Sequence, residues 1–137
     1  MLIVDDNMFN IITLETILDM QFKIKVDKAM NGADSLEKVR CRQNENRIDC
    51  CTCEKNNHNY KLIFMDCNMP IMDGFEASNE IRSISDIDHS ELKIFALTAN
   101  TNESFRLRCQ QSGMDGLLTK PISAETIQNI LLRQGLI

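Results

Sequence analysis

The sequence predicts an α/β domain in which helices cover both faces of a doubly wound parallel sheet. Short, nearly continuous apolar runs alternate five times with longer segments whose apolar residues recur three or four positions apart. Such continuous runs are typical of strands that are buried on both faces. The 137 residues suit one domain with a substantial core, so we expect a single domain over 1–137.

Five apolar runs are the predicted strands. The first, Leu2–Val4, ends at two aspartates, and Ile24–Val26 alternates apolar and polar residues as a strand does. The remaining strands are expected over 61–65, 93–97 and 117–119. Since a helical segment separates each strand from the next, neighbouring strands should pair in parallel.

The segments between the strands have helical periodicity. The first, third and fourth helices are expected over 7–20, 74–84 and 104–112. The second helix begins after the turn signal Asn31–Gly32, and Gly113 stops the fourth. Ser123 can cap a fifth helix that carries an acidic residue in its first turn.

The segment 41–60 interrupts this pattern. It is polar, rich in asparagine and aperiodic, so we expect a loop inserted between the second helix and the third strand. Cys50 and Cys53 have the spacing of one pair of zinc ligands, and His58 could add a third. The second pair of a structural zinc site is missing unless Cys41 joins. A loop with free thiols is the simpler interpretation, with a bound metal as the alternative.

The charge balance excludes several classes of partner. A net charge of −5 and an isoelectric point near 5.0 argue against direct binding to nucleic acid or to an anionic membrane. No apolar run approaches the ~20 residues that cross a bilayer. Acidic residues follow the first apolar residues too closely for a signal peptide. We therefore expect a cytoplasmic domain that makes no membrane contact of its own.

Polar side chains stand directly after four of the predicted strands. Asp5 and Asp6 follow the first strand, Asp66 the third, Thr98 the fourth and Lys120 the fifth. Because right-handed crossovers bring the carboxyl ends of parallel strands to one edge of the sheet, we expect these residues to meet there.

This set of residues has a recognisable chemistry. Three converging carboxylates repel one another unless a cation lies among them, and oxygen ligands favour a hard ion such as Mg²⁺. An aspartate can also act as a nucleophile and form a phosphoryl-enzyme intermediate, for which Asp66 is the candidate. Lys120 would supply positive charge and Thr98 a hydroxyl donor, which is most of what phosphoryl transfer requires.

Four separated motifs resemble those of a response-regulator receiver domain of the CheY type. They are Ile3–Asn7, Met65–Gly74, Ala96–Ala99 and Leu118–Ile122. Their style is most similar to the receivers of hybrid sensor histidine kinases, and the likeness covers 2–40 and 61–132. The resemblance implies a flavodoxin-like (βα)5 sandwich with strand order 2-1-3-4-5. It also implies that the chain is a fragment of a larger protein, a hybrid histidine kinase.

The resemblance also assigns roles to single residues. Asp66 matches the phosphoacceptor, which takes its phosphoryl group from a phosphohistidine on a kinase or phosphotransfer domain. Asp6, Asp66 and the backbone carbonyl of Asn68 match the direct Mg²⁺ ligands, and Asp5 matches the acid that contacts the metal through water. No oligomeric state is implied.

At the fourth and fifth strands two residues match the family pattern and one departs from it. Thr98 matches the switch hydroxyl, and Lys120 matches the phosphate-binding lysine. The peptide bond from Lys120 to Pro121 is usually cis in this family. Leu117 departs from the pattern, because the family often has a tyrosine or phenylalanine there as a rotating switch residue.

Two other functions remain open at this level. An aspartate-nucleophile phosphohydrolase of the haloacid-dehalogenase type also uses Asp, Thr, Lys and Mg²⁺, although its nucleophile follows the first strand in a DxD pattern. A receiver-shaped docking module that cannot be phosphorylated is the other. Turnover would separate the first from a receiver, which takes up one phosphoryl group, loses it slowly and is no enzyme beyond that reaction.

Overall fold

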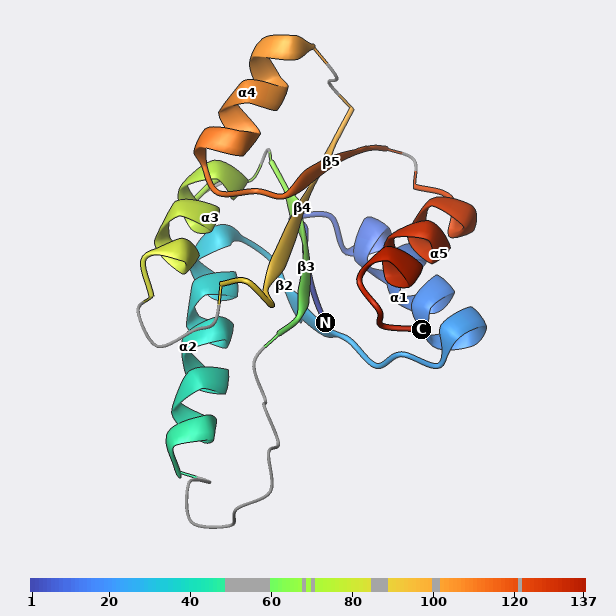
Figure 1. Ribbon diagram of the computed structural model, residues 1–137, viewed down its shortest axis with the longest axis horizontal. Coiled ribbons are helices and arrows are strands. Elements are labelled where there is room, and N and C mark those ends of the chain that lie inside the picture. Colours follow the sequence, from blue (N-terminus) through green and yellow to red (C-terminus); the bar gives the residue numbers. More distant parts are fainter. Residues whose placement is uncertain (49–59, 68, 70, 85–88, 100–101, 121) are drawn as a thin grey trace.

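The computed structural model describes residues 1–48, 60–67, 69, 71–84, 89–99, 102–120 and 122–137, with only the backbone of 42–48. Its five strands form one parallel sheet in the order β2-β1-β3-β4-β5 (Figure 1). The strands are β1 (Leu2–Val4), β2 (Asp27–Ala29), β3 (Leu62–Asp66), β4 (Lys93–Thr98) and β5 (Gly116–Thr119). The predicted fold class and strand order are therefore confirmed.

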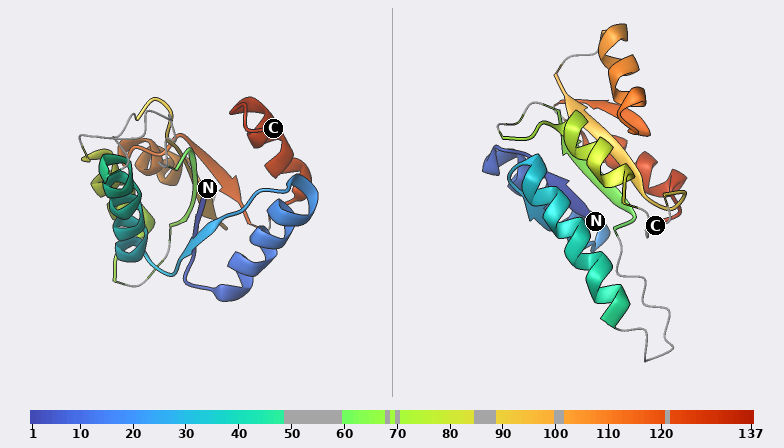
Figure 2. Two further views of the ribbon diagram at one scale, coloured as in Figure 1. Left: turned by 90° about the horizontal axis from the view of Figure 1, so that it is seen from below. Right: turned by 90° about the vertical axis from the view of Figure 1, so that its left-hand side faces the viewer.

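Five helices alternate with these strands and cover both faces of the sheet. They are α1 (Met8–Phe22), α2 (Gly32–Ile48), α3 (Gly74–Arg82), α4 (Glu103–Gln111) and α5 (Ala124–Arg133). Helices α1 and α5 lie on one face, and α2, α3 and α4 lie on the other (Figures 1 and 2). None of the described helices is long and apolar enough to span a bilayer.

Two hydrophobic clusters, one on each side of the sheet, form the core. On one side Ile11 and Leu18 of α1 pack with Ile127 and Leu131 of α5. On the opposite face, residues of α2, α3 and α4 pack against β3 and β4. Strand β3 lies in the middle and all five of its residues are buried, which explains why its sequence is almost continuously apolar.

Polar caps set where the helices begin, and so where the loops at the sheet edge end. The Asn7 side chain accepts a hydrogen bond from the Phe9 N–H at 2.9 Å, and Asp73 does the same for Glu76 at 2.9 Å. The predicted cap Ser123 accepts a hydrogen bond from the Thr126 N–H at 3.2 Å. Asn7 and Ser123 stand three and four residues beyond the ends of β1 and β5, so these two loops are short.

The predicted second strand was placed three residues too early. Strand β2 is Asp27–Ala29, whose residues pair with Leu2–Val4, whereas Ile24–Val26 is not a strand. Helix α1 runs to Phe22, and Lys23 then adopts a left-handed conformation with φ of 57°. The chain reverses there, and the side chains of Ile24 and Val26 pack against the cluster beneath α1. Their alternation reflects this packing and not strand pairing.

The predicted loop over 41–60 was also wrong in its first half. Helix α2 continues to Ile48, although Val39 is the last of its residues known to be buried. A helix that extends beyond the sheet needs no apolar stripe, and Arg, Gln and Glu are good helix formers, so hydrophobic periodicity gives no sign of it. Residues 49–59, including Cys50, Cys53 and His58, lie outside the described residues.

Candidate functional site

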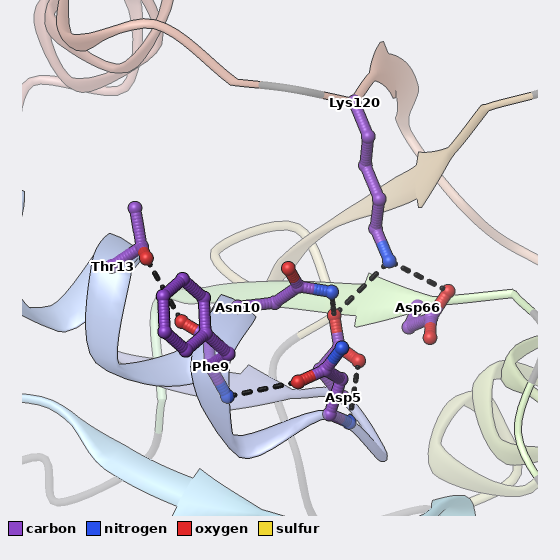
Figure 3. Close-up of polar contacts among 7 residues, drawn as sticks. Asp5, Phe9, Asn10, Thr13, Asp66 and Lys120 are labelled. Atoms are coloured by element: carbon purple, nitrogen blue, oxygen red, sulfur yellow. Dashed lines mark hydrogen bonds and ion pairs between the residues drawn. The ribbon is translucent and has the colours of Figure 1, made fainter.

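The carboxyl ends of the central strands bring together residues from distant parts of the chain. Carboxylate oxygens of Asp5, Asp6 and Asp66 all lie within 4.8 Å of one another. The Lys120 ammonium reaches this cluster from the segment after β5, between Asp5 and Asp66 (Figure 3). The predicted convergence of these four residues is therefore present in the structure.

Asp5 is a buried acid held by three hydrogen bonds. Its side chain is 1% exposed, and its Oδ1 accepts a hydrogen bond from the Asn7 N–H at 2.9 Å. Its Oδ2 accepts from Asn10 Nδ2 at 3.2 Å and from Lys120 Nζ at 3.1 Å. Three donors hold this buried carboxylate in one orientation, which suits it to fix the position of other groups.

Asp66 and Asp6 are placed differently. Asp66 is the last residue of β3 and is only 5% exposed, and its Oδ1 lies 3.3 Å from Lys120 Nζ. Asp6 is two residues beyond the end of β1 and is exposed to solvent. The cluster thus combines two buried carboxylates with one at the surface, and a ligand from solvent would meet Asp6 on the outer side.

Lys120 carries the positive charge of the site. Burial disfavours the charged ammonium, but hydrogen bonds and charge interactions with Asp5 and Asp66 outweigh it and raise the pKa of Lys120 above its ordinary value. Its backbone N–H donates to the carbonyl oxygen of Thr98 at 2.9 Å. Lys120 is therefore a fully charged group whose backbone is tied to the end of β4.

Thr98 lies at the same edge, at the end of β4. It is buried, and its neighbour Leu97 pairs with Asp66 across the two strands. Thr98, which bears the hydroxyl, is thus one position beyond Leu97, the residue that pairs with Asp66. Asn68, Asn100 and Pro121 lie outside the described residues, so the expected Asn68 carbonyl ligand and the cis peptide bond stay predictions.

The start of α3 lies against the end of β3, next to Asp66. The Gly74 N–H donates to the Cys67 carbonyl oxygen at 3.3 Å, and a Cβ on Gly74 would collide with the carbonyl oxygen of Asp66. Only glycine fits this close approach. Burial raises the pKa of the Cys67 thiol well above its ordinary range, so Cys67 is a neutral neighbour of Asp66.

A cleft of about 410 Å³ opens between α1 and the chain that follows β5. Phe9 and Thr13 line it from α1, Ile122 lines it from the chain after β5, and Asp5 and Lys120 form its polar end. Figure 3 shows Phe9, Thr13, Asp5 and Lys120 at this site. The acidic cluster is thus reached along an apolar wall.

The sequence analysis did not identify Asn10 as a residue of the site, but it placed Leu117 on the fifth strand, where the structure has it. Asn10 was not singled out, although its position in the first turn of α1, five residues after Asp5, brings its amide to that carboxylate. Leu117 lies on β5, half-buried against the core cluster beneath α3 and α4. A leucine therefore packs at the position where an aromatic residue was expected from the resemblance.

The donors of the acidic cluster fit a hard divalent cation. Three carboxylates in reach of one another, with no His or Cys among them, form an oxygen set of the kind that Mg²⁺ prefers. With Lys120 as the single cation of this group, the four side chains carry a formal charge of −2, which favours binding of a dication.

Comparisons with known proteins agree with this geometry. The family model described as the response regulator receiver domain matches residues 1–132. Over 135 residues, 98% of the chain, it is 33% identical to hybrid signal transduction histidine kinase L of Dictyostelium discoideum. Over 131 residues, 95% of the chain, it is 34% identical to the peroxide stress-activated histidine kinase mak1 of Schizosaccharomyces pombe. The chain spans 7% of the length of each kinase.

Two solved structures similar to this chain contain a bound ion or a partner protein. The receiver domain of sensor histidine kinase PA1611 from Pseudomonas aeruginosa has a magnesium ion coordinated in its active site cleft. Its sequence is 29% identical to that of this chain, and the two structures superpose with a TM-score of 0.74. The match covers 97% of this chain and 93% of the PA1611 receiver. The receiver domain of Ssk1, crystallised with the histidine phosphotransfer protein Ypd1 of Saccharomyces cerevisiae, is 26% identical. Its TM-score is 0.78, with 98% and 87% of the two chains covered.

Proposed function

Because the chain belongs to the response regulator receiver domain family, we propose that it accepts a phosphoryl group on Asp66 in a Mg²⁺-dependent transfer from a partner's phosphohistidine. The observation that supports this most is the position of Lys120. Its ammonium lies 3.1 Å from Asp5 and 3.3 Å from Asp66, between a buried acid and the candidate nucleophile. A phosphoryl oxygen entering this space would meet a preorganised positive charge.

The transfer exchanges one bond to phosphorus for another. An Oδ of Asp66 attacks the phosphorus atom, the phosphorus–nitrogen bond of the phosphohistidine breaks, and an oxygen–phosphorus bond forms. The imidazole leaves with the electron pair of the broken bond. Lys120 stabilises the charge on the phosphoryl oxygens, and the Thr98 hydroxyl donates a hydrogen bond to one of them. Asp66 thereby becomes an aspartyl phosphate.

Asp5, Asp6 and Asp66 would hold the magnesium ion, together with the backbone carbonyl of Asn68. When bound, the ion neutralises negative charge that would otherwise oppose the approach of a phosphoryl group. Asp5 orients the cluster through its hydrogen bonds to Asn7 and Asn10, and Asp6 completes it from the solvent side.

The partner is proposed to approach over α1. Phe9 is 79% exposed and Ile12 is also exposed, and Phe9 lines the cleft that leads to Asp5 and Lys120. An apolar surface next to a charged site suits a helical phosphotransfer domain that presents a phosphohistidine among apolar side chains. The added charge on Asp66 would then shift a conformational equilibrium through Thr98 and the segment that follows it.

The test is the mass of the intact protein after incubation with acetyl phosphate, with and without Mg²⁺. We expect one phosphoryl adduct that requires Mg²⁺ and is absent in Asp66→Asn. The matched control is Asp73→Asn, because Asp73 caps α3 shortly after Asp66 and asparagine is an equally good cap. This control should be labelled like the wild type.

Other outcomes would select the alternatives. Absence of any adduct, where another receiver is labelled, would contradict the proposal and favour a docking module. Release of many equivalents of phosphate per protein molecule would favour a phosphohydrolase.

A further inference from the structure

We propose that the cleft between α1 and the chain after β5 binds the acyl chain of an apolar acyl phosphate, a small molecule that phosphorylates Asp66 directly. The proposal rests on the phosphoacceptor function proposed above and adds a class of donor to the phosphohistidine of a protein partner. The volume of the cleft, about 410 Å³, is in the range of small-ligand pockets. Its polar end, Asp5 and Lys120, belongs to the phosphoryl site itself.

The wall of the cleft is apolar from the interior of the domain to its surface. Of the apolar side chains that line it, three are buried, two are half-buried, and one is 79% exposed. These are, in that order, Ile3, Leu14 and Leu97, Ile17 and Ile122, and Phe9. A ligand chain that enters beside the exposed ring would therefore lose contact with water as it passes inwards, which favours an apolar chain.

The polar side chains that line the cleft are engaged within the protein. The Thr13 hydroxyl donates a hydrogen bond to the Phe9 carbonyl oxygen at 2.8 Å. Asn10 Nδ2 donates to Asp5 Oδ2 at 3.2 Å, and the Lys120 ammonium lies 3.1 Å from the same oxygen. The wall thus offers little to a polar substituent, whereas one end offers charge. This combination suits a ligand with an apolar chain and an anionic head.

The position of Asp66 gives the direction in which such a ligand would lie. In Figure 3 the Phe9 side chain lies on one side of Lys120, and Asp66 lies on the other. In phosphoryl transfer the attacking and leaving oxygens are roughly in line, with the phosphorus atom between them. When the phosphoryl group is beside Lys120, attack by Asp66 therefore directs the leaving group towards the cleft.

The leaving group must depart without taking a proton from the cleft. Among the described residues that line it, only Asp5 and Lys120 are titratable, and they are paired with each other. An alkoxide is a poor leaving group unless an acid protonates it, whereas a carboxylate leaves as a stable anion. An apolar acyl phosphate meets this requirement, and an apolar phosphate ester does not.

The transfer balances without a further reactant. An Oδ of Asp66 attacks the phosphorus atom, the bond between phosphorus and the acyl oxygen breaks, and an oxygen–phosphorus bond forms on Asp66. The carboxylate of the donor leaves with the electron pair of the broken bond. The products are the aspartyl phosphate and a free carboxylate.

The first experiment compares hexanoyl phosphate with acetyl phosphate in the presence of Mg²⁺. Hexanoate and acetate are leaving groups of similar basicity, so the two donors differ mainly in their apolar chain. We expect hexanoyl phosphate to label the protein at least about tenfold faster at equal concentration, because the cleft removes its additional methylene groups from water. The initial rate of adduct formation, followed by intact mass, is the measurement. Equal rates, or faster labelling by acetyl phosphate, would overturn the proposal.

A matched pair of variants tests whether the cleft causes this preference. Thr13→Phe adds bulk to the cleft from α1, whereas Thr16 is not among the described residues that line it. Both threonines are exposed, and each hydroxyl donates to the carbonyl oxygen four residues earlier. The ratio of the two labelling rates should fall at least about threefold in Thr13→Phe and persist in Thr16→Phe. A ratio unchanged in Thr13→Phe would overturn the assignment to this cleft.

The two donors also separate this proposal from the phosphoacceptor function on which it rests. If acetyl phosphate labels the protein and hexanoyl phosphate is no faster, the donor site is wrong and the phosphoacceptor function stands. If neither donor labels the protein, or if both label Asp66→Asn as they label the wild type, the phosphoacceptor function of Asp66 is itself contradicted. The two failures are thus distinguishable.

Discussion

Lys120 Nζ lies 3.1 Å from Asp5 Oδ2, although 115 residues separate the two along the chain. The same ammonium is 3.3 Å from Asp66 Oδ1. Lys120 therefore occupies the space between the two buried acids and balances part of their charge. It competes electrostatically with any cation in the cluster, yet it offers the positive charge that a phosphoryl group requires.

Changing Lys120 should separate these two effects. In Lys120→Met the acids lose their internal counterion, so we expect Mg²⁺ to bind several-fold more tightly, by roughly 3- to 10-fold. Phosphorylation by acetyl phosphate should slow by about tenfold or more, because the phosphoryl oxygens lose their charge partner. Calorimetric Mg²⁺ titration and the rate of adduct formation measure the two quantities. Lys25→Met, on an exposed lysine, is the matched control, and weaker Mg²⁺ binding by Lys120→Met would contradict the expectation.

Asp6 should matter for the metal and little for the fold. Since Asp6 is exposed, Asp6→Asn should change the free energy of unfolding by no more than about 0.5 kcal/mol. The loss of one carboxylate should weaken Mg²⁺ binding by about tenfold or more. The rise in melting temperature with Mg²⁺ concentration reports this affinity. Asp19→Asn, which removes a surface ion pair with Lys25, controls for net charge and should behave as the wild type.

The ion pairs of Lys120 should leave a signature at alkaline pH. The pKa of Lys120 is higher in the folded chain than its ordinary value of 10.5, so its contribution to stability is complete below pH 10.5. This contribution should decline as the pH rises from there through the folded pKa. We expect the difference in unfolding free energy between wild type and Lys120→Met to stay constant up to about pH 10 and then shrink. A difference that grew at high pH would show the pKa shift to be reversed.

A second cluster, at the opposite edge of the sheet, should govern stability. Arg82 donates to the carbonyl oxygens of Gly113 and Leu92, each at 2.9 Å, and to Asp115 Oδ2 at 2.7 Å. It thereby joins the end of α3 to the chain before β4 and β5. Arg82→Met removes the guanidinium from all three acceptors, although Asp115 Oδ2 still accepts from the Ile94 N–H at 2.8 Å. The change should cost about 2–3 kcal/mol in urea unfolding.

The control for this change is Arg133→Met, on an exposed arginine at the end of α5, which should cost less than about 0.5 kcal/mol. Because Arg82 is remote from the acidic cluster, the folded Arg82→Met protein should still bind Mg²⁺ with normal affinity. A loss of Mg²⁺ binding under conditions where the variant is folded would show that the two edges are coupled.

The strand ends could be predicted from the sequence, because a buried strand is an apolar run and the first polar residue after it marks its end. A continuous apolar run such as Leu62–Met65, with helical segments on either side, predicts an interior strand, and the polar residue that follows it is then expected at the sheet edge. The same logic placed Asp5, Asp6, Asp66 and Lys120 together, and the structure confirms that they meet. Asn10 could not be identified in this way, because its role depends on the exact orientation of α1 above Asp5.

The two errors in the fold prediction, the strand expected at 24–26 and the loop expected from 41 onward, have a common origin. The apolar side chains of Ile24 and Val26 pack under α1 although the segment is not a strand, and the polar segment 41–48 continues α2 as a helix. In both places the hydrophobic pattern of the sequence does not record the backbone conformation. The left-handed Lys23 and the length of α2 depend on local backbone energies that periodicity does not record.

The positions of the chain ends bear on how the domain can be attached to others. Met1 and Leu136 pack against the same hydrophobic cluster, and Leu136 lies in a hollow beside Lys61 and Lys93, where β3 and β4 begin. Both termini are therefore at the edge of the sheet opposite the acidic cluster (Figure 1). A fluorescent protein or a surface anchor fused at either end would leave the acidic edge uncovered. The domain is thus suited to reporter fusions and to immobilisation with its reactive side facing the solution.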